Sequence, residues 1–241
     1  MKVELTPAVI LHQRHYRESS LLLEVFSREY GRISLVAKGA RSNKKKALAL
    51  YQTHRSLSVS WSGKGEMGTL TEIEADGPPF VLTGKSLMSV FYLNELLLRL
   101  LHRHESHPQL FDTYLMTLTR LAHGESELYS LRYFEKQLLD SIGYGLILDH
   151  ELETGTAIDS KENYFYSINE GPYLHKPMSA TGVEISGATL VSLATENLDT
   201  PDSAKQVRQL MRMTLNSYLG DKPLASRELF KAYSQQGPDK S

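Results

Sequence analysis

Residues 31–46 read GRISLVAKGARSNKKK, a short strand pattern that runs into a basic loop. Residues 33–36 alternate between apolar and polar positions, and Gly39 stands at the expected turn, where it lets the backbone approach a partner closely. Five cations lie within nine residues, with no acid among them: Lys38, Arg41, Lys44, Lys45 and Lys46. Such a cluster suits a polyanion, because each Lys or Arg that meets a phosphate releases counterions. The alternative is a solvated hairpin tip whose charges only keep the chain soluble.

The charges of the whole chain are strongly segregated, although the total is close to neutral, with 27 Lys and Arg against 28 Asp and Glu. Residues 1–64 contain 12 cations and 4 acids, a net charge of +8. Residues 65–203 contain 8 cations and 21 acids, a net of −13, and residues 204–241 contain 7 and 3, a net of +4. The basic first and last segments therefore favour a polyanionic partner.

Composition excludes several classes of site. Cysteine is absent from the 241 residues, which removes disulfides, thiolate zinc sites, iron–sulfur clusters and cysteine nucleophiles. No apolar run is long enough to span a membrane, and the apolar patch near the N-terminus is too interrupted for a signal peptide. We therefore expect a cytoplasmic protein that needs no cofactor, no metal and no membrane.

The first part of the chain has the pattern of β-strands. Five short apolar segments are separated by turn-prone stretches, with no crossover helix between them: 5–13, 20–27, 32–38, 54–61 and 67–74. This number and size predict a small antiparallel barrel, for which the five-stranded OB-fold is the commonest architecture. Gly77-Pro78-Pro79 ends the last strand, so residues 1–79 form the predicted nucleic-acid-binding domain.

Beyond residue 79 the apolar spacing changes to that of helices. Helical periodicity is present over 85–104, 108–123 and 126–141, and helices resume near 186–197, 203–219 and 223–234. Residues 146–183 are polar and contain several glycines and prolines, with a hairpin expected near Tyr164 and Tyr173. The fold class is therefore α+β: an OB-fold barrel followed by a mainly α-helical domain, 80–241, with an irregular insertion at about 146–183.

No catalytic motif is present. The sequence has no phosphate-binding loop, dinucleotide fingerprint or nucleophile elbow. His102, His104 and His107 are spaced so that the three do not share one helical face, which favours a polar helix end over a metal site. We therefore expect a binding protein and not an enzyme.

Two further sets of basic residues are candidates for binding. Arg208 and Arg212 are i,i+4 neighbours, and with Arg227 they could form a second basic surface or pair with the acidic middle of the same chain. Arg132 lies on a leucine-rich helix, where an arginine beside an apolar groove can hold a terminal carboxylate. The alternative for this position is core packing with an exposed arginine.

Several motifs, in order along the chain, resemble the RecO family of bacterial recombination mediators. The strongest is Leu35-Val36-Ala37-Lys38-Gly39-Ala40-Arg41. The others are Ala8 to Leu11, Glu18 to Leu21, Val25 to Ser27, Gly31-Arg32, Tyr92 to Leu97, Leu131 to Glu135, Leu138-Leu139, Gly143 to Gly145, Tyr218 to Leu224 and Ser226 to Phe230. Each motif is weak alone, but together they cover nearly the whole chain.

The resemblance implies an OB-fold, a helical domain and a role in DNA repair and homologous recombination at the nucleoid. Members of the family bind single- and double-stranded DNA, anneal complementary strands, recognise the C-terminal tail of single-stranded DNA-binding protein, and help RecR to load RecA. Many carry a four-cysteine zinc module in the region matching 146–183, which this chain lacks. The loop would then hold its shape by packing alone or be mobile. The resemblance leaves open whether RecF takes part.

On this interpretation DNA phosphates contact the basic loop and neighbouring cations: Arg14, Lys38, Arg41, Lys44, Lys45, Lys46, Arg55, Arg208, Arg212 and Arg227. Trp61 and Tyr51 are candidates for stacking on bases, although Trp61 lies on an expected strand, where a tryptophan is more often a core residue. Arg132 would bind the partner tail. Two alternatives remain, an OB-fold RNA-binding or ribosome-associated protein and, less favoured, an enzyme such as a nuclease.

Overall fold

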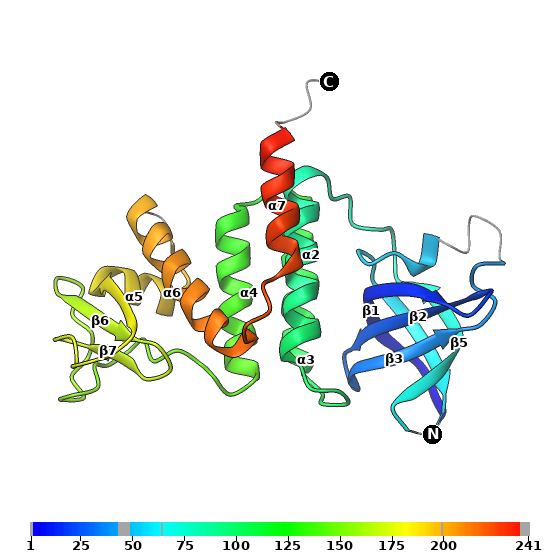
Figure 1. The fold of residues 1–241 in the computed structure, drawn as a ribbon, viewed down its shortest axis with the longest axis horizontal. Coiled ribbons are helices and arrows are strands. Elements are labelled where there is room, and N and C mark those ends of the chain that lie inside the picture. Colours follow the sequence, from blue (N-terminus) through cyan, green and yellow to red (C-terminus); the bar gives the residue numbers. More distant parts are fainter. Residues whose placement is uncertain (1, 43–48, 64, 199, 237–241) are drawn as a thin grey trace. The chain divides into compact units, whose positions relative to one another are not determined.

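The computed structural model describes residues 2–42, 49–63, 65–198 and 200–236. The chain forms two compact units. The first contains residues 1–125 together with 224–241, and the second contains residues 126–223. The last helix of the chain thus returns to the first unit (Figure 1).

The five predicted strands form a closed barrel with the OB-fold order β1-β2-β3-β5-β4 (Figure 1). The strands are β1 (Lys2–Tyr16), β2 (Ser20–Ser27), β3 (Gly31–Ala37), β4 (Leu57–Ser62) and β5 (Met67–Ala75). Four of the pairings are antiparallel, but β3 and β5 close the barrel in parallel. The prediction of an OB-fold barrel is confirmed, and only the direction of this closing pair departs from a purely antiparallel barrel.

The barrel interior is filled by alternate residues of its strands, as the period of two requires. On β3, Ile33, Leu35 and Ala37 point inward and belong to one buried cluster. Trp61 and Tyr51 belong to the same cluster and are only 6% and 7% exposed. The faces of these two aromatic rings are therefore part of the packed core, and neither residue is an open platform on the barrel surface.

The outer face of β1 and β2 is also covered, because the helices α2 (Gly84–Leu100) and α3 (Pro108–Ala122) pack against it. The rings of Phe26 and Phe111 meet edge to face with centroids 5.5 Å apart. Asn94 donates a hydrogen bond from Nδ2 to the carbonyl of Leu11 at 3.1 Å. Seven of the eight residues of β2 are consequently buried, on both sides of the sheet.

Charged side chains complete this packing. The Arg28 guanidinium donates two hydrogen bonds of 2.9 Å to the Asp112 carboxylate. This contact raises the pKa of Arg28 and lowers that of Asp112, chiefly through the hydrogen bonds.

Helix α7 (Ala225–Gln236) packs beside α2 in the same unit (Figure 1).

The predicted boundary at residue 79 falls at the end of the barrel, and the boundaries of the compact units fall elsewhere. Residues 80–125, which contain α2 and α3, group with the barrel because these helices cover its strands. A separate domain of residues 1–79 thus remains a prediction.

The second unit combines helices with a small sheet. Its helices are α4 (Glu127–Ser141), α5 (Gly187–Ala194) and α6 (Pro201–Leu219). Its strands β6 (Asn163–Ser167), β7 (Gly171–Tyr173) and β8 (Gly182–Ser186) form a sheet in the order β7-β6-β8. The hairpin expected near Tyr164 and Tyr173 is present, whereas β8 was not predicted.

A carboxylate organises a turn within the segment at about 146–183 that was predicted to be an irregular insertion. Glu151 is 3% exposed, and its side chain accepts hydrogen bonds from the backbone N–H groups of Glu153 at 2.8 Å and Thr154 at 2.6 Å. The Thr154 hydroxyl donates a further bond to the same carboxylate. A hydrogen-bonded turn centred on Glu151 therefore adds to packing in this part of the loop, and the expectation for the whole of 146–183 stays a prediction.

Candidate nucleic-acid interface

One end of the barrel carries four exposed cations, Arg14, Arg17, Lys38 and Arg41, which we call the basic tip. The strand register brings these residues together. β1 and β2 pair up to Tyr16 and Ser20, so the turn that holds Arg17 lies at this end. Leu21 pairs with Ala37, which places the exit from β3, and therefore Lys38, beside the same turn.

Arg41 is fixed to the β1–β2 turn by its backbone and by its side chain. Its backbone N–H donates to the carbonyl of Ser19 at 2.9 Å, and its Nη1 donates to the carbonyl of Glu18 at 3.0 Å. The Gly39 backbone has a φ of +67°, a conformation that glycine adopts without strain. These bonds use carbonyl oxygens and no carboxylate, so the positive charge of Arg41 is not neutralised.

The charges of the basic tip are available to a ligand. Within the described residues, none of the four cations forms an ion pair with an Asp or Glu side chain, although Arg17 lies over the ring of Tyr16 at 5.4 Å. Arg17 was not among the predicted site residues. The sequence feature that could have identified Arg17 is its position in a turn directly after the strand that contains Arg14.

The remaining predicted residues of the barrel are placed differently. Lys44, Lys45 and Lys46 lie outside the described residues. Arg55 is half-buried, and its Nε is a buried donor with no hydrogen-bond partner in the described part of the chain. Burial, followed by the charge of Arg55, lowers the pKa of the neighbouring His54. Arg55 is therefore less open to solvent than the basic tip.

A second set of cations lies on α6. Lys205, Arg208 and Arg212 are exposed and spaced by three and four residues, so they follow one face of the helix; we call them the α6 stripe. None of them forms an ion pair among the residues that the structure describes. Of the two alternatives for Arg208 and Arg212, a free basic surface thus fits better than pairing with the acidic middle of the chain.

Arg227 lies on a different helix from this stripe. It lies on α7, which belongs to the first unit, and its side chain is half-buried. Arg208 and Arg212 belong to the second unit.

Arg132 is buried, which the expectation of an exposed arginine did not foresee. Its side chain is 10% exposed, and its Nη2 lies 2.9 Å from Oε1 of Glu135, whose side chain is fully buried. Its Nε has no hydrogen-bond partner in the described parts of the chain. The nearest carboxylate to this arginine is thus supplied by its own helix, and the assignment of Arg132 to a partner tail remains a prediction.

Neither a metal cluster nor a membrane helix was found in the described ranges. No group of three His, Asp or Glu side chains there has the arrangement of a metal site. None of the helices found there combines the length and apolar character that crossing a bilayer requires.

Comparisons with known proteins agree with the fold. The family described as Recombination protein O N terminal matches residues 1–78, and Recombination protein O C terminal matches residues 82–228. A protein of Nitrosococcus oceani named DNA repair protein RecO is 44% identical over 237 residues, covering 98% of this chain and 96% of the relative. A protein of the same name from Nitrosospira multiformis is 41% identical, and the match covers 96% of this chain and 96% of that relative. Another from Coxiella burnetii is 40% identical, and the match covers 95% of this chain and 98% of that relative. The chain therefore belongs to the RecO family of DNA repair proteins.

Proposed function

We propose that this protein binds single- and double-stranded DNA and anneals complementary strands during recombinational repair. The observation that carries the proposal is the basic tip, whose four cations are exposed and form no ion pair with Asp or Glu in the described residues. Each phosphate that a Lys or Arg neutralises releases counterions, and this release supplies affinity without requiring a particular sequence. A mediator that must act anywhere on a chromosome needs this kind of binding.

Two basic surfaces offer a physical route to annealing. The basic tip lies in the first unit and the α6 stripe lies in the second, so one chain has a phosphate-binding surface on each. Two complementary strands repel each other through their phosphates, and neutralising part of that charge lowers the cost of bringing them together. This mechanism needs no bond to be made or broken, and we propose that the protein is not an enzyme.

The proposal extends to proteins that act at the same DNA. We propose that the helical part recognises the C-terminal tail of single-stranded DNA-binding protein, and that the protein cooperates with RecR in loading RecA. The support is family membership, together with Arg132, whose Nε retains a free donor in the described residues. A tail carboxylate at Arg132 would share the guanidinium with Glu135 or displace it.

The test is annealing of complementary oligonucleotides coated with single-stranded DNA-binding protein, run beside a coating protein that lacks its C-terminal tail. Annealing that requires the tail supports both DNA handling and the partner site. Annealing with either coat supports the basic surfaces and contradicts tail recognition. No annealing of coated or bare strands contradicts the proposal, and comparison of RNA and DNA oligomers would then test the RNA-binding alternative.

A further inference from the structure

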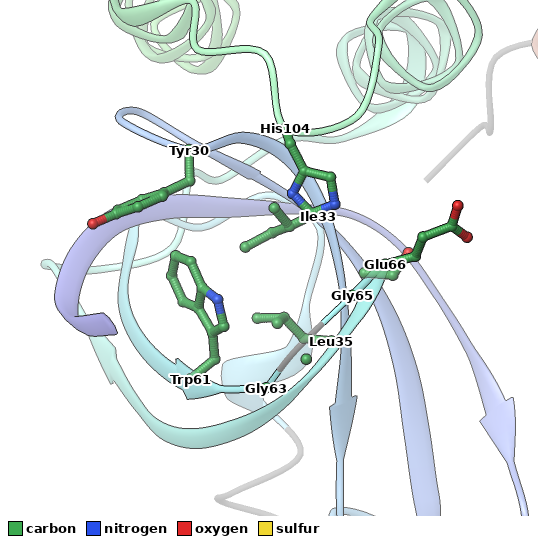
Figure 2. A pocket seen from close by; sticks show the side chains of 10 residues that line it. Tyr30, Ile33, Leu35, Trp61, Gly63, Gly65, Glu66 and His104 are labelled. Carbon is green, nitrogen blue, oxygen red and sulfur yellow. The ribbon is translucent and has the colours of Figure 1, made fainter. Parts of the chain in front are cut away.

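A pocket of about 520 Å³ opens near the start of β3, within the first unit. Its walls are the inner residues of β3, the β4–β5 turn and the α2–α3 loop (Figure 2). This volume lies within the range of small-molecule sites in proteins. The proposed DNA interface does not use this pocket, because the basic tip lies at the opposite end of β3.

Aromatic and aliphatic side chains form most of the pocket. Ile33, Leu35 and Trp61 are buried and form its floor. The ring of Tyr30 meets that of Trp61 edge to face, with centroids 5.0 Å apart and an interplanar angle of 87°. Figure 2 shows the rings of Tyr30, Trp61 and His104 among the side chains that line the pocket. A flat ring that enters would meet the half-buried ring of Tyr30 and the small part of Trp61 that faces the pocket.

The missing side chain of Gly68 keeps the pocket open. A Cβ at this position would lie 2.9 Å from Cδ2 of Leu35 and 2.9 Å from Cδ1 of Trp61, so it would press on the floor. Gly63 and Gly65 line the rim, where a partner can approach the backbone closely. The pocket is therefore shaped for an object larger than a water molecule.

His104 is held over the opening by the backbone. Its φ is +62°, which is uncommon for a residue with a side chain, and its N–H donates to the carbonyl of Arg32 at 3.0 Å. The α2–α3 loop packs closely against the start of β3, as the contact at Gly31 shows: a Cβ at this position would overlap the carbonyl oxygen of Glu105. A residue held in such a conformation by its surroundings is a marker of functional positions.

From these contacts we infer that the pocket receives one unstacked nucleobase of a bound single strand. The inference rests on the proposed DNA binding and adds a site for the base to the site for the phosphates. Stacking on aromatic rings accepts every base, because each has a π-face. The imidazole of His104 lies at the rim, where it can pair with a donor or an acceptor on the edge of a base.

The position of the pocket fits a strand that follows β3. In OB-folds, the β4–β5 loop is one of the segments that contact oligonucleotides, and here Gly63 and Gly65 of that loop line the pocket. Ser34 in the pocket wall and Lys38, which follows the last residue of β3, are four residues apart, a separation of at most about 13 Å. A single strand whose phosphates meet the basic tip can therefore reach the pocket with a base a few nucleotides away.

Trp61 provides a direct reporter, because it is the only tryptophan of the chain. The experiment titrates the full chain with single-stranded oligo(dT) and records Trp61 fluorescence, while the anisotropy of a labelled oligonucleotide records DNA binding. A matched oligonucleotide with the same phosphates but abasic sugars is the control. We expect oligo(dT) to quench Trp61 as the anisotropy rises, and the abasic strand to raise the anisotropy without quenching.

Two variants of the same loop separate a base contact from an indirect change. His104→Gly removes the ring and suits the positive φ, whereas His102→Ala removes an exposed imidazole that does not line the pocket. We expect His104→Gly to weaken oligo(dT) binding about five-fold or more and to reduce the quenching. The affinity of the abasic strand should be unchanged, and His102→Ala should behave as the parent chain.

Three results would overturn the inference. Binding of oligo(dT) without any change in Trp61 fluorescence would leave the DNA-binding proposal intact but would show that no base enters the pocket. Equal effects of the two histidine variants would do the same. Quenching by a peptide with an aromatic side chain, in the absence of quenching by DNA, would assign the pocket to a protein partner. A flat anisotropy signal with both oligonucleotides would instead contradict the DNA-binding proposal itself.

Discussion

The carboxylate of Glu95 on α2 accepts a hydrogen bond of 2.8 Å from the backbone N–H of Ser226, 131 residues further along the chain. Its other oxygen accepts the N–H of Ala225, also at 2.8 Å. Ala225 and Ser226 begin α7, whose first N–H groups have no partners within the helix. A side chain of α2 thus supplies the N-terminal cap of α7 and ties the end of the chain to the first unit.

Replacing Glu95 should loosen α7. We expect Glu95→Ala to cost about 1–2 kcal/mol of stability for this helix, the usual effect of losing a charged cap. The measurement is amide hydrogen exchange across residues 225–236, which should accelerate while exchange in the barrel strands does not. Glu228→Ala is the matched control, because Glu228 is an exposed residue of the same helix whose ion pair with Lys231 contributes little.

The same cap should depend on pH. Burial raises the pKa of Glu95, but the hydrogen bonds from Ser226 and Ala225 outweigh burial, so the pKa lies below its ordinary value. A lowered pKa in the folded state stabilises the protein above the ordinary glutamate value of about 4.3, and this contribution disappears as the pH falls through the folded value. Exchange in α7 should therefore differ between Glu95→Gln and the parent chain at neutral pH and converge as the pH falls through the lowered pKa of Glu95. A constant difference would contradict the ionised cap.

The basic tip should set the salt dependence of DNA binding. Changing Arg14 and Lys38 together to Ala removes two exposed cations, and the slope of log K against log salt for single strands should fall by about 0.7 for each lost phosphate contact. The measurement is anisotropy of a labelled oligonucleotide over a salt series. Lys85 and Lys161 changed together to Ala, also exposed, remove the same charge elsewhere. Equal slopes for the two double variants would show that the basic tip does not contact DNA phosphates.

Lys44, Lys45 and Lys46 need their own test, since they follow the basic tip in sequence and lie outside the described residues. The triple change to Ala should weaken DNA binding and lower the same slope further. An unaltered slope would confine the phosphate contacts of this segment to the basic tip.

The α6 stripe should matter more for annealing than for binding one strand. We expect Arg208→Ala with Arg212→Ala to slow annealing of complementary oligonucleotides several-fold, because the second strand loses its phosphate contacts. Affinity for a single short oligonucleotide should change less, since the basic tip remains. Gln209→Ala, on the exposed side of the same helix, is the control. Unchanged annealing would limit the interface to the barrel.

Glu151 should determine the order of its loop. Glu151→Ala leaves the N–H groups of Glu153 and Thr154 without their acceptor, so their exchange should accelerate, whereas Glu153→Ala removes an exposed carboxylate and should have little effect. The hydrogen bond from the Thr154 side chain is the largest cause of a lowered pKa at Glu151. The loop should thus be fully ordered above the ordinary glutamate pKa and loosen as the pH falls through the lowered pKa of Glu151. The chemical shift of the Thr154 amide across this range is the measurement, and an unshifted amide would contradict the role of the carboxylate.

The sequence predicted most of the fold because local patterns determine the elements. The strand that contains Ile33 and Leu35 alternates with period two, and the leucines of α2 and α3 recur every three or four residues. β8 was missed because Gly182–Ser186 is only 5 residues long and is held by pairing with β6, a contact that no local pattern reveals. The parallel pairing of β3 with β5 was missed for the same reason, because it is a contact between distant strands that no local pattern reveals.

The candidate site was less predictable, because it depends on which side chains meet. Lys38 and Arg41 form a recognisable cluster in the sequence, but their proximity to Arg17 follows from strand register. The burial of Arg132 against Glu135 depends on tertiary packing. The pocket beneath His104 joins three segments that are far apart in the sequence, so only the fold could reveal it.

The helices that cover β2 have a practical consequence for anyone who would study the barrel alone. Cutting the chain after residue 79 would remove α2 and α3, which cover Phe26 and the neighbouring outer residues of β1. The fragment would then expose these apolar side chains to water. Such a fragment would tend to aggregate, and its nucleic-acid affinity would report on an artificial face. Dissection of this protein is better done by point substitution than by truncation.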